Sequence, residues 1–195
     1  MKMYKKMREG DEVVTVRVDG VFKGLEAEKI FKMQTDLKLK VQMSEAPAQV
    51  KLVEQVSANT DVIYLEIALP FPLANRDFVQ KRLYVGNKED PELVKKLGLY
   101  DWSHKYYAFL SEATERPEYP PKSKLVRAET KMNYWIFEED PNEKGTVKVR
   151  LVTCQKLNGN IPNVMINKAT SSIKKTMIEP IFDSYKKIFG VEITK

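Results

Sequence analysis

Cysteine and histidine are almost absent from this chain. Cys154 and His104 are the single residues of their kinds among 195, so an internal disulfide is impossible and a zinc site has too few soft ligands. Cys154 lies in an alternating pattern typical of a strand, where a small buried thiol serves packing more readily than a nucleophilic dyad with His104. We therefore expect no metal site, no cofactor and a cytoplasmic location.

Glycine is also scarce, and long apolar runs are missing. The eight glycines form no glycine-rich loop ahead of a helix, so neither a phosphate-binding loop nor a dinucleotide-binding fingerprint is present. The longest stretch without a charged residue, 157–167, has eleven residues and contains Gly159 and Pro162, whereas a membrane-spanning helix needs about 20 apolar residues. The basic amino terminus lacks the apolar core of a secretion signal. We expect a chain that neither crosses a bilayer nor is secreted.

Charged residues are abundant and slightly unbalanced. Lys and Arg number 33 against 27 Asp and Glu, which gives a net charge of +6, and 43% of the residues are hydrophobic. This composition is typical of a folded globular chain, and the length suits one domain over 1–195, which we expect to be a monomer. The lysines alternate with acidic residues and accompany no aromatic recognition motif, so nucleic acid is not an expected partner. A basic surface better suits transient, peripheral contact with anionic membranes.

The spacing of apolar residues predicts an α+β fold. Alternation typical of strands covers 12–18, 50–57, 62–69, 78–85, 105–112, 124–137 and 145–157. Turn-forming residues between neighbouring runs, such as 59–61 and 140–145, favour an antiparallel meander. Helical spacing predicts helices over 26–41 and 91–97, and one long helix that begins at Pro162 and is kinked by Pro180 near 176–177.

One face of two predicted strands is partly charged and partly aromatic. Between 126 and 137 this face comprises Arg127, Glu129, Lys131, Asn133, Trp135 and Phe137, and between 76 and 85 it comprises Arg76, Phe78, Gln80, Arg82 and Tyr84. Periodicity alone leaves two interpretations open. The face is either a solvated outer surface with exposed aromatics or the lining of a cavity roofed by the last helix.

Three motifs resemble those of START (StAR-related lipid transfer) domains. LPFPLANRDFV at 69–79 is similar to the family's FP.s.RD.v motif, KLVRAE at 124–129 to its vRa strand, and GNIPNVMIN at 159–167 to the start of its last helix. The resemblance extends from about residue 2 to 189 in the family's order. It implies a helix-grip fold, in which a curved antiparallel β-sheet wraps around a long C-terminal α-helix and encloses a lipid tunnel. The family's N-terminal helix is missing.

The resemblance, closest to the phosphatidylcholine carriers of the family, implies a non-enzymatic protein that binds one lipid, most readily a phospholipid, and transfers it between membranes. A sterol or ceramide carrier and a lipid-sensing regulatory module without net transfer stay open as alternatives. By the same resemblance, cavity or head-group contacts are assigned to Arg82, Lys131, Asn133, Glu129, Phe78 and Lys38. Membrane contact and gating are assigned to Phe71, Leu73, Pro70, Pro72, Ile166, Ile173 and Met177.

Two of these assignments have an alternative. Arg82 resembles the cavity arginine of sterol-type members and then needs a buried partner, for which Glu129 and Glu66 are candidates; otherwise Arg82 or Lys131 reaches solvent. Phe71 either enters the membrane or packs onto the core. The positions matched to the aromatic choline cage of phosphatidylcholine carriers hold Leu65, Phe78, Lys131 and Thr153. Because one of these four is aromatic, we expect a broad head-group preference.

Overall fold

The computed structural model describes residues 1–7, 13–43, 49–69, 71–96, 104–161 and 179–191. The elements in chain order are β1 (Lys2–Lys6), β2 (Thr15–Lys23), α1 (Ala27–Thr35), α2 (Leu37–Lys40), β3 (Gln49–Ser57), β4 (Thr60–Ile67), β5 (Arg76–Gly86), α3 (Pro91–Lys96), β6 (Tyr106–Ala113), β7 (Val126–Arg127), β8 (Glu129–Glu139), β9 (Thr146–Lys156) and α5 (Glu179–Phe189).

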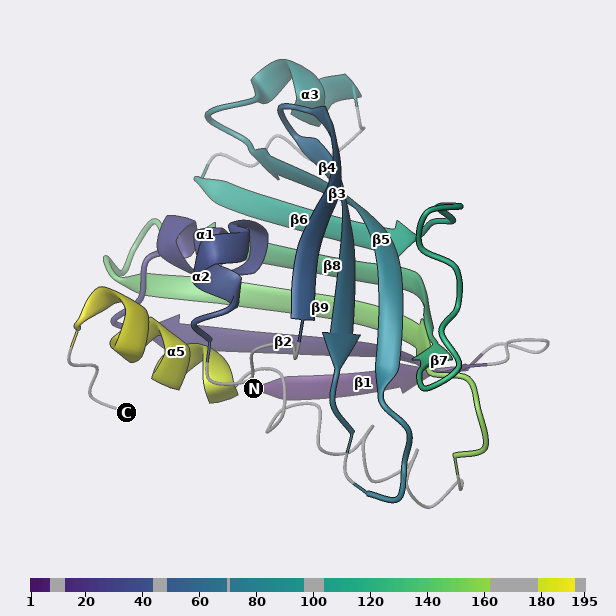
Figure 1. Ribbon diagram of the computed structural model, residues 1–195. Coiled ribbons are helices and arrows are strands. Elements are labelled where there is room, and N and C mark those ends of the chain that lie inside the picture. Colours follow the sequence, from purple (N-terminus) through teal and green to yellow (C-terminus); the bar gives the residue numbers. More distant parts are fainter. Residues whose placement is uncertain (8–12, 44–48, 70, 97–103, 162–178, 192–195) are drawn as a thin grey trace.

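The described strands form one nine-stranded sheet in the order β1-β2-β9-β8-β6-β5-β4-β3. All neighbours on this path are antiparallel, and β7 adds a short parallel pairing to β5. Strands β3 to β9 follow one another as the predicted meander, and the β1–β2 hairpin extends it beyond β9. In Figure 1, the axes of β3, β4 and β5 are roughly vertical, whereas those of β2, β8 and β9 are roughly horizontal, so the sheet is strongly curved.

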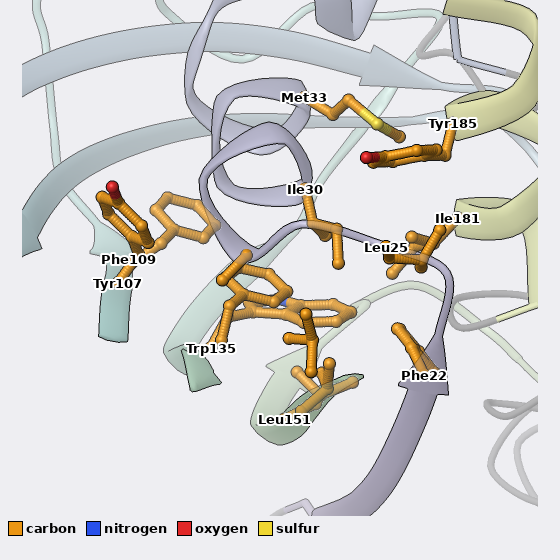
Figure 2. Close-up of a cluster of buried hydrophobic side chains, with 14 of the residues drawn as sticks. Phe22, Leu25, Ile30, Met33, Tyr107, Phe109, Trp135, Leu151, Ile181 and Tyr185 are labelled. Carbon is orange, nitrogen blue, oxygen red and sulfur yellow. The ribbon is translucent and has the colours of Figure 1, made fainter. Parts of the chain in front are cut away.

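Helices α1, α2 and α5 lie on the same side of this sheet (Figure 1), which we call the helix-facing side. The apolar residues on the buried face of α1 are Ala27, Ile30 and Met33, at the three-residue spacing of an amphipathic helix, and Gln34 is also buried. Figure 2 shows α1 and α5 packed together over an apolar cluster, which includes Phe22 of β2, Trp135 of β8 and Leu151 of β9. Each such side chain contributes about 1.5–3 kcal/mol when fully buried. The helix-grip arrangement predicted from the sequence is confirmed.

Several predicted boundaries need correction. The predicted 26–41 helix is two helices, because Asp36 has an extended backbone (φ −77°, ψ 117°) and its side chain accepts a hydrogen bond from the Lys38 N–H at 2.8 Å to cap α2. Strand β1 was not predicted, and the predicted 12–18 strand runs from Thr15 to Lys23. The predicted 124–137 strand is divided into β7 and β8. The predicted helix start at Pro162 and the kink near 176–177 lie outside the described residues.

Candidate functional site

A row of polar side chains crosses the helix-facing side of the sheet. Register pairing aligns Asp61 of β4, Arg82 of β5, Ser111 of β6, Asn133 of β8 and Thr153 of β9. Residues directly opposite each other on antiparallel strands share one face of a sheet, and all five are buried. We call these five residues the polar row.

An aromatic and aliphatic row lies beside the polar row, two residues further along each strand. It consists of Tyr84, Phe109, Trp135 and Leu151, again aligned by register. Three of them belong to the core cluster beneath α1 and α5. Phe78, on the same face of β5, is buried against Ile63 and Leu65. The face that is charged in part and aromatic in part is therefore an interior face, and its interpretation as a solvated outer surface is wrong.

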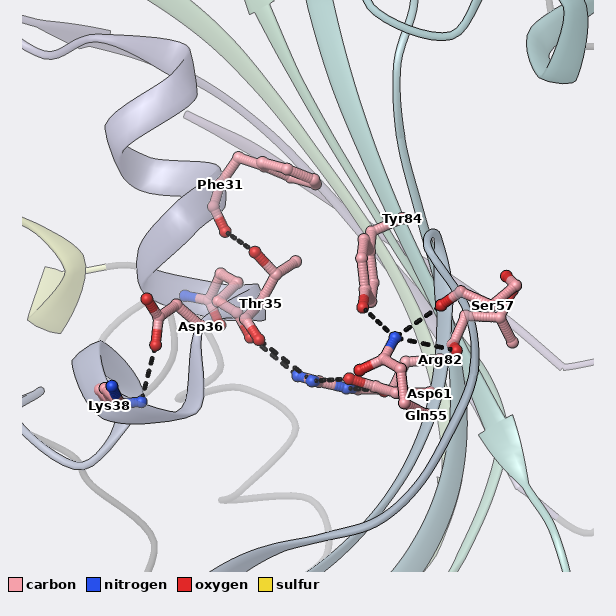
Figure 3. A network of polar contacts seen from close by, with 11 residues as sticks. Phe31, Thr35, Asp36, Lys38, Gln55, Ser57, Asp61, Arg82 and Tyr84 are labelled. Atoms are coloured by element: carbon pink, nitrogen blue, oxygen red, sulfur yellow. Dashed lines mark hydrogen bonds and ion pairs between the residues drawn. The ribbon is translucent and has the colours of Figure 1, made fainter.

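Arg82 is the charged centre of the polar row and is 1% exposed. Its Nε and Nη2 donate to the two carboxylate oxygens of Asp61 at 2.7 and 2.5 Å. Its Nη1 and Nη2 also donate to the backbone carbonyls of Gln34 and Thr35, at 3.2 and 3.0 Å, where α1 ends (Figure 3). The guanidinium is thereby neutralised and most of its five donors are used.

The observed partner of Arg82 differs from the predicted ones. Glu66 accepts a hydrogen bond from Lys122 at 2.8 Å, and Glu129 pairs with Lys131. Asp61 was assigned to the turn before β4, yet it shares the alternation of Ile63 and Leu65 and so points inward. The alternative in which Arg82 reaches solvent is also wrong.

Lys40 brings a second positive charge to this region. Its ammonium lies 3.4 Å from the side-chain oxygen of Gln34, the residue whose carbonyl binds Arg82. Lys40 is partly exposed, and the partial loss of solvent around its ammonium, together with repulsion by Arg82, lowers its pKa to about 8. Within the described part of the chain, no carboxylate pairs with Lys40. Lys40, Arg82 and Asp61 together therefore carry one excess positive charge at neutral pH.

Lys38, the lysine that the sequence assigned to the head group, is exposed on α2. Its backbone N–H caps the helix through Asp36, as Figure 3 shows. Its side chain therefore does not line the interior, and the lysine near Arg82 is Lys40. Lys38 is the residue that the family resemblance matches to a phosphate-binding position. That match does not place the separate short helix α2, so sequence reasoning missed Lys40.

A β-bulge in β8 moves two predicted residues away from the interior. The pairing of β8 with β9 shifts between Thr130 and Met132, so Thr130 rather than Lys131 shares the face of Asn133. The Thr130 hydroxyl is buried and accepts a hydrogen bond from Gln80 at 2.6 Å. Lys131 and Glu129 pair with each other at 2.5 Å and are partly exposed. Their prediction as interior contacts is wrong, because alternation fails at a bulge.

Two buried polar atoms of the polar row have no hydrogen-bond partner. Asn133 donates through Nδ2 to the Ser111 hydroxyl at 3.4 Å. Its Oδ1 and the Thr153 hydroxyl lack any partner in the described part of the chain, although the two residues are only 8% and 6% exposed. An unfilled buried polar atom costs about 1–3 kcal/mol. These two atoms therefore mark a place where a bound molecule can supply hydrogen bonds.

The loop between β4 and β5 presents an apolar side chain to solvent. Phe71 is 95% exposed, so the alternative in which it packs onto the core is wrong. Pro72 is exposed and Leu73 is half-buried. The Leu69 N–H donates to the Asn75 side chain at 3.1 Å and closes the loop. The other residues assigned to the gate lie outside the described residues: Pro70, Ile166, Ile173 and Met177.

The Arg-Asp pair that follows this loop fixes its position. Arg76 is buried and donates to the carbonyls of Ala74, Leu157 and Asn158, the last two at 2.8 and 2.9 Å, which ties the loop to the end of β9. Asp77 is buried and accepts two hydrogen bonds from Arg127 of β7, at 3.1 and 2.9 Å. Both residues of the motif therefore anchor the structure around the loop.

The described residues contain neither a helix suited to cross a membrane nor a cluster of metal-ligating side chains. None of the helices in those ranges has the length and apolar character needed to cross a membrane. Across the same ranges, His, Cys, Asp and Glu side chains do not gather in groups of three or more that would suit a metal ion.

Comparisons with known proteins give a consistent answer. The START domain family profile matches residues 2–183. Phosphatidylcholine transfer protein of Mus musculus is 25% identical over 189 residues, which are 95% of this chain and 81% of that protein. The crystal structure of human STARD10 matches with a TM-score of 0.79 at 16% identity, over 96% of this chain and 70% of that one.

A more distant fold neighbour is the Zhui aromatase/cyclase of Streptomyces sp. R1128. It matches with a TM-score of 0.50 at 7% identity, over 89% of this chain and 96% of that one. Likeness of fold therefore does not by itself separate a carrier from an enzyme.

Proposed function

Because this chain belongs to the START family of lipid-binding and lipid-transfer domains, we propose that it holds one phospholipid between its sheet and C-terminal helix and carries it between membranes. In this proposal residues 1–195 act as one monomeric domain in the cytoplasm. The domain needs no metal or cofactor and touches membranes transiently. Asp61 and Arg82 neutralise each other and hold α1, so neither is free to act as an acid or base, which supports a carrier rather than an enzyme.

The excess positive charge near Arg82 is the observation that favours a phospholipid over other lipids. An interior charge is tolerated when it is paired, and Asp61 already neutralises Arg82. Lys40 is left without a carboxylate in the described part of the chain. A phosphate group brings the missing negative charge and several acceptors for the ammonium. A sterol or a ceramide brings no such charge.

Lipid exchange between vesicles tests this proposal. Delipidated protein should move labelled phosphatidylcholine or phosphatidylethanolamine between vesicles faster than labelled cholesterol or ceramide. Lys40→Met should slow phospholipid exchange about tenfold, because the phosphate loses its counter-charge. Lys38→Met is the matched control, since it removes an exposed lysine from the same short helix, and it should leave exchange unchanged.

Two results would redirect the proposal. Exchange of cholesterol or ceramide without phospholipid, equally fast in Lys40→Met, would support the sterol or ceramide carrier. A tightly bound phospholipid that is never released to acceptor vesicles would support the lipid-sensing module. Nearly identical exchange by Lys40→Met and the unsubstituted protein would remove Lys40 from the phosphate site.

A further inference from the structure

We propose that Asn133 and Thr153 read the head group of the bound phospholipid and select one that brings N–H or O–H donors, such as ethanolamine, over choline. This inference rests on the proposed function, because it concerns the same interior and the same class of lipid. It starts from the two unfilled polar atoms of the polar row.

The orientation of the Asn133 side-chain amide in the structure sets which kind of partner is missing. Its Nδ2 faces the Ser111 hydroxyl at 3.4 Å, which leaves Oδ1 without a donor in the described part of the chain. A carbonyl oxygen accepts hydrogen bonds and donates none. A molecule that satisfies Oδ1 must therefore present an N–H or an O–H group.

The neighbouring hydroxyl strengthens this requirement. Thr153 lies directly opposite Asn133 on β9 and on the same face of the sheet. Its hydroxyl can accept a hydrogen bond as well as donate one. A primary ammonium carries three N–H donors, as in lysine, so one such group can bind both oxygens. A quaternary ammonium has no N–H and leaves both atoms unfilled.

The position of the pair relative to the positive end of the row agrees with a phospholipid. Arg82 and Asn133 are separated along the row by Ser111 of β6, so their Cα atoms are about 10 Å apart at the usual strand spacing. A phosphate held by Lys40 beside Arg82 leaves the rest of the head group free to extend along the row. The row thus has a positive group at one end and, about two strands away, two polar atoms without a partner, an arrangement that suits a phosphate and a donor of one head group.

The test uses phospholipids whose head groups lose donors one at a time. Delipidated protein is mixed with vesicles that contain equal amounts of phosphatidylethanolamine, its N-methyl and N,N-dimethyl forms, and phosphatidylcholine, and the bound lipids are quantified by native mass spectrometry. Size grows evenly along this series, but the last methyl group removes the last N–H donor. We expect binding to fall most at that last step, with ethanolamine bound roughly tenfold better than choline.

Two variants assign the preference to the pair. Asn133→Leu has a similar volume but no acceptor, and Thr153→Val removes the hydroxyl alone. Asn133→Leu should bring the ratio of bound phosphatidylethanolamine to bound phosphatidylcholine close to one, and Thr153→Val should lower this ratio. Thr146→Val is the matched control, since Thr146 is also buried on β9 but lies at the other end of the strand, and it should keep the ratio of the unsubstituted protein.

Each other result has a definite meaning. Equal binding of all four lipids, or a preference that survives both variants, overturns the inference while the proposed function stands. A preference for choline also overturns it, because the head group would then lie on the aromatic row near Trp135 through cation-π attraction. Failure to bind any phospholipid overturns this inference and the proposed function together.

Discussion

At the scale of the residue, the pair of Arg82 and Asp61 should be a main support of the interior. Asp61→Asn keeps the size of the side chain but leaves the guanidinium buried beside a neutral amide. Removing one partner of a buried ion pair costs about 3–5 kcal/mol. We expect urea denaturation of the lipid-free variant to show a loss of that order in the free energy of unfolding.

An exposed pair provides the comparison for Asp61. Glu143 lies 2.6 Å from Lys23, and both side chains are more than half exposed. Glu143→Gln should cost much less stability than Asp61→Asn, because solvent screens such pairs. If the two substitutions were equally mild, the interior would not depend on neutralising Arg82.

The lowered pKa of Lys40 predicts a pH-dependent lipid affinity. In the lipid-free protein this pKa is about 8, below the ordinary 10.5, because of the partial loss of solvent and of repulsion by Arg82. A phosphate would favour the charged ammonium, so phospholipid affinity should fall about tenfold from pH 7 to pH 9 as Lys40 loses its proton. Equilibrium binding at both values measures this. Lys40→Arg stays charged at both and should give a flat profile.

The same group affects folding with the opposite sign. The folded-state pKa of Lys40 lies below the unfolded value, so the unfolded chain binds more protons between about pH 8 and 10.5. The contribution of Lys40 to the stability of the lipid-free protein therefore increases as pH rises through that window.

The affinity prediction has its own control. If phospholipid affinity also fell from pH 7 to pH 9 in Lys40→Arg, the pH dependence would belong to another group.

At the scale of the element, alternation and helical spacing predicted most strands and helices because most of these elements bury one face against the core. The failures occur where local chemistry interrupts a period. Asp36 caps α2 and breaks the predicted helix, and the bulge at Lys131 exchanges the faces of β8. For this reason Phe78, Arg82 and Asn133 were placed correctly in the interior, whereas Glu129 and Lys131 were not.

The ion pair between Asp61 and Arg82 could not be predicted from sequence patterns, for a different reason. Asp61 and Arg82 are 21 residues apart, and their contact depends on the register of β4 and β5. Register is set by the turn and by the packing of the whole sheet. The alternation of Asp61 with Ile63 and Leu65 was the one available signal that it faces inward.

The turn that follows β9 contains Gly159, whose backbone conformation makes its substitution destabilising. Gly159 has a positive φ of 72°, and an added Cβ would lie 3.3 Å from Arg76 Nη2. The three nitrogens of this guanidinium each donate to a different backbone carbonyl, which holds the side chain in place. Gly159→Ala should therefore lower the free energy of unfolding by the left-handed backbone cost of about 1–2 kcal/mol plus the cost of moving Arg76. Thermal or urea denaturation measures the loss.

Gly145 separates these two costs. It also has a positive φ, 77°, but an added Cβ would meet nothing within 4 Å. Gly145→Ala should carry the backbone cost alone, so the difference between the two variants reports the contact with Arg76. A smaller loss for Gly159→Ala than for Gly145→Ala would contradict the tight anchoring of Arg76.

At the scale of the whole molecule, a carrier must hold its lipid away from water and also meet a bilayer. In the proposed function, the first task falls to the helix-facing side of the sheet, where the polar row and three of the residues beside it, Phe109, Trp135 and Leu151, are buried. For the second, the loop between β4 and β5 offers Phe71 at 95% exposure on a base fixed by Arg76 and Asp77. Because the exposed Phe71 is not part of the buried interior, the proposed function expects substitutions in the loop to change membrane contact without changing lipid binding.

Phe71→Ala tests that separation. Moving a phenylalanine side chain from water into an apolar layer contributes about 1.5–3 kcal/mol, so we expect vesicle-to-vesicle transfer to slow about tenfold. The free energy of unfolding should stay within about 0.5 kcal/mol, because the side chain is exposed. Tyr4→Ala, which removes another exposed aromatic from β1, should leave transfer unchanged. Equal slowing by both variants, or a clear loss of stability in Phe71→Ala, would argue against membrane contact through this loop.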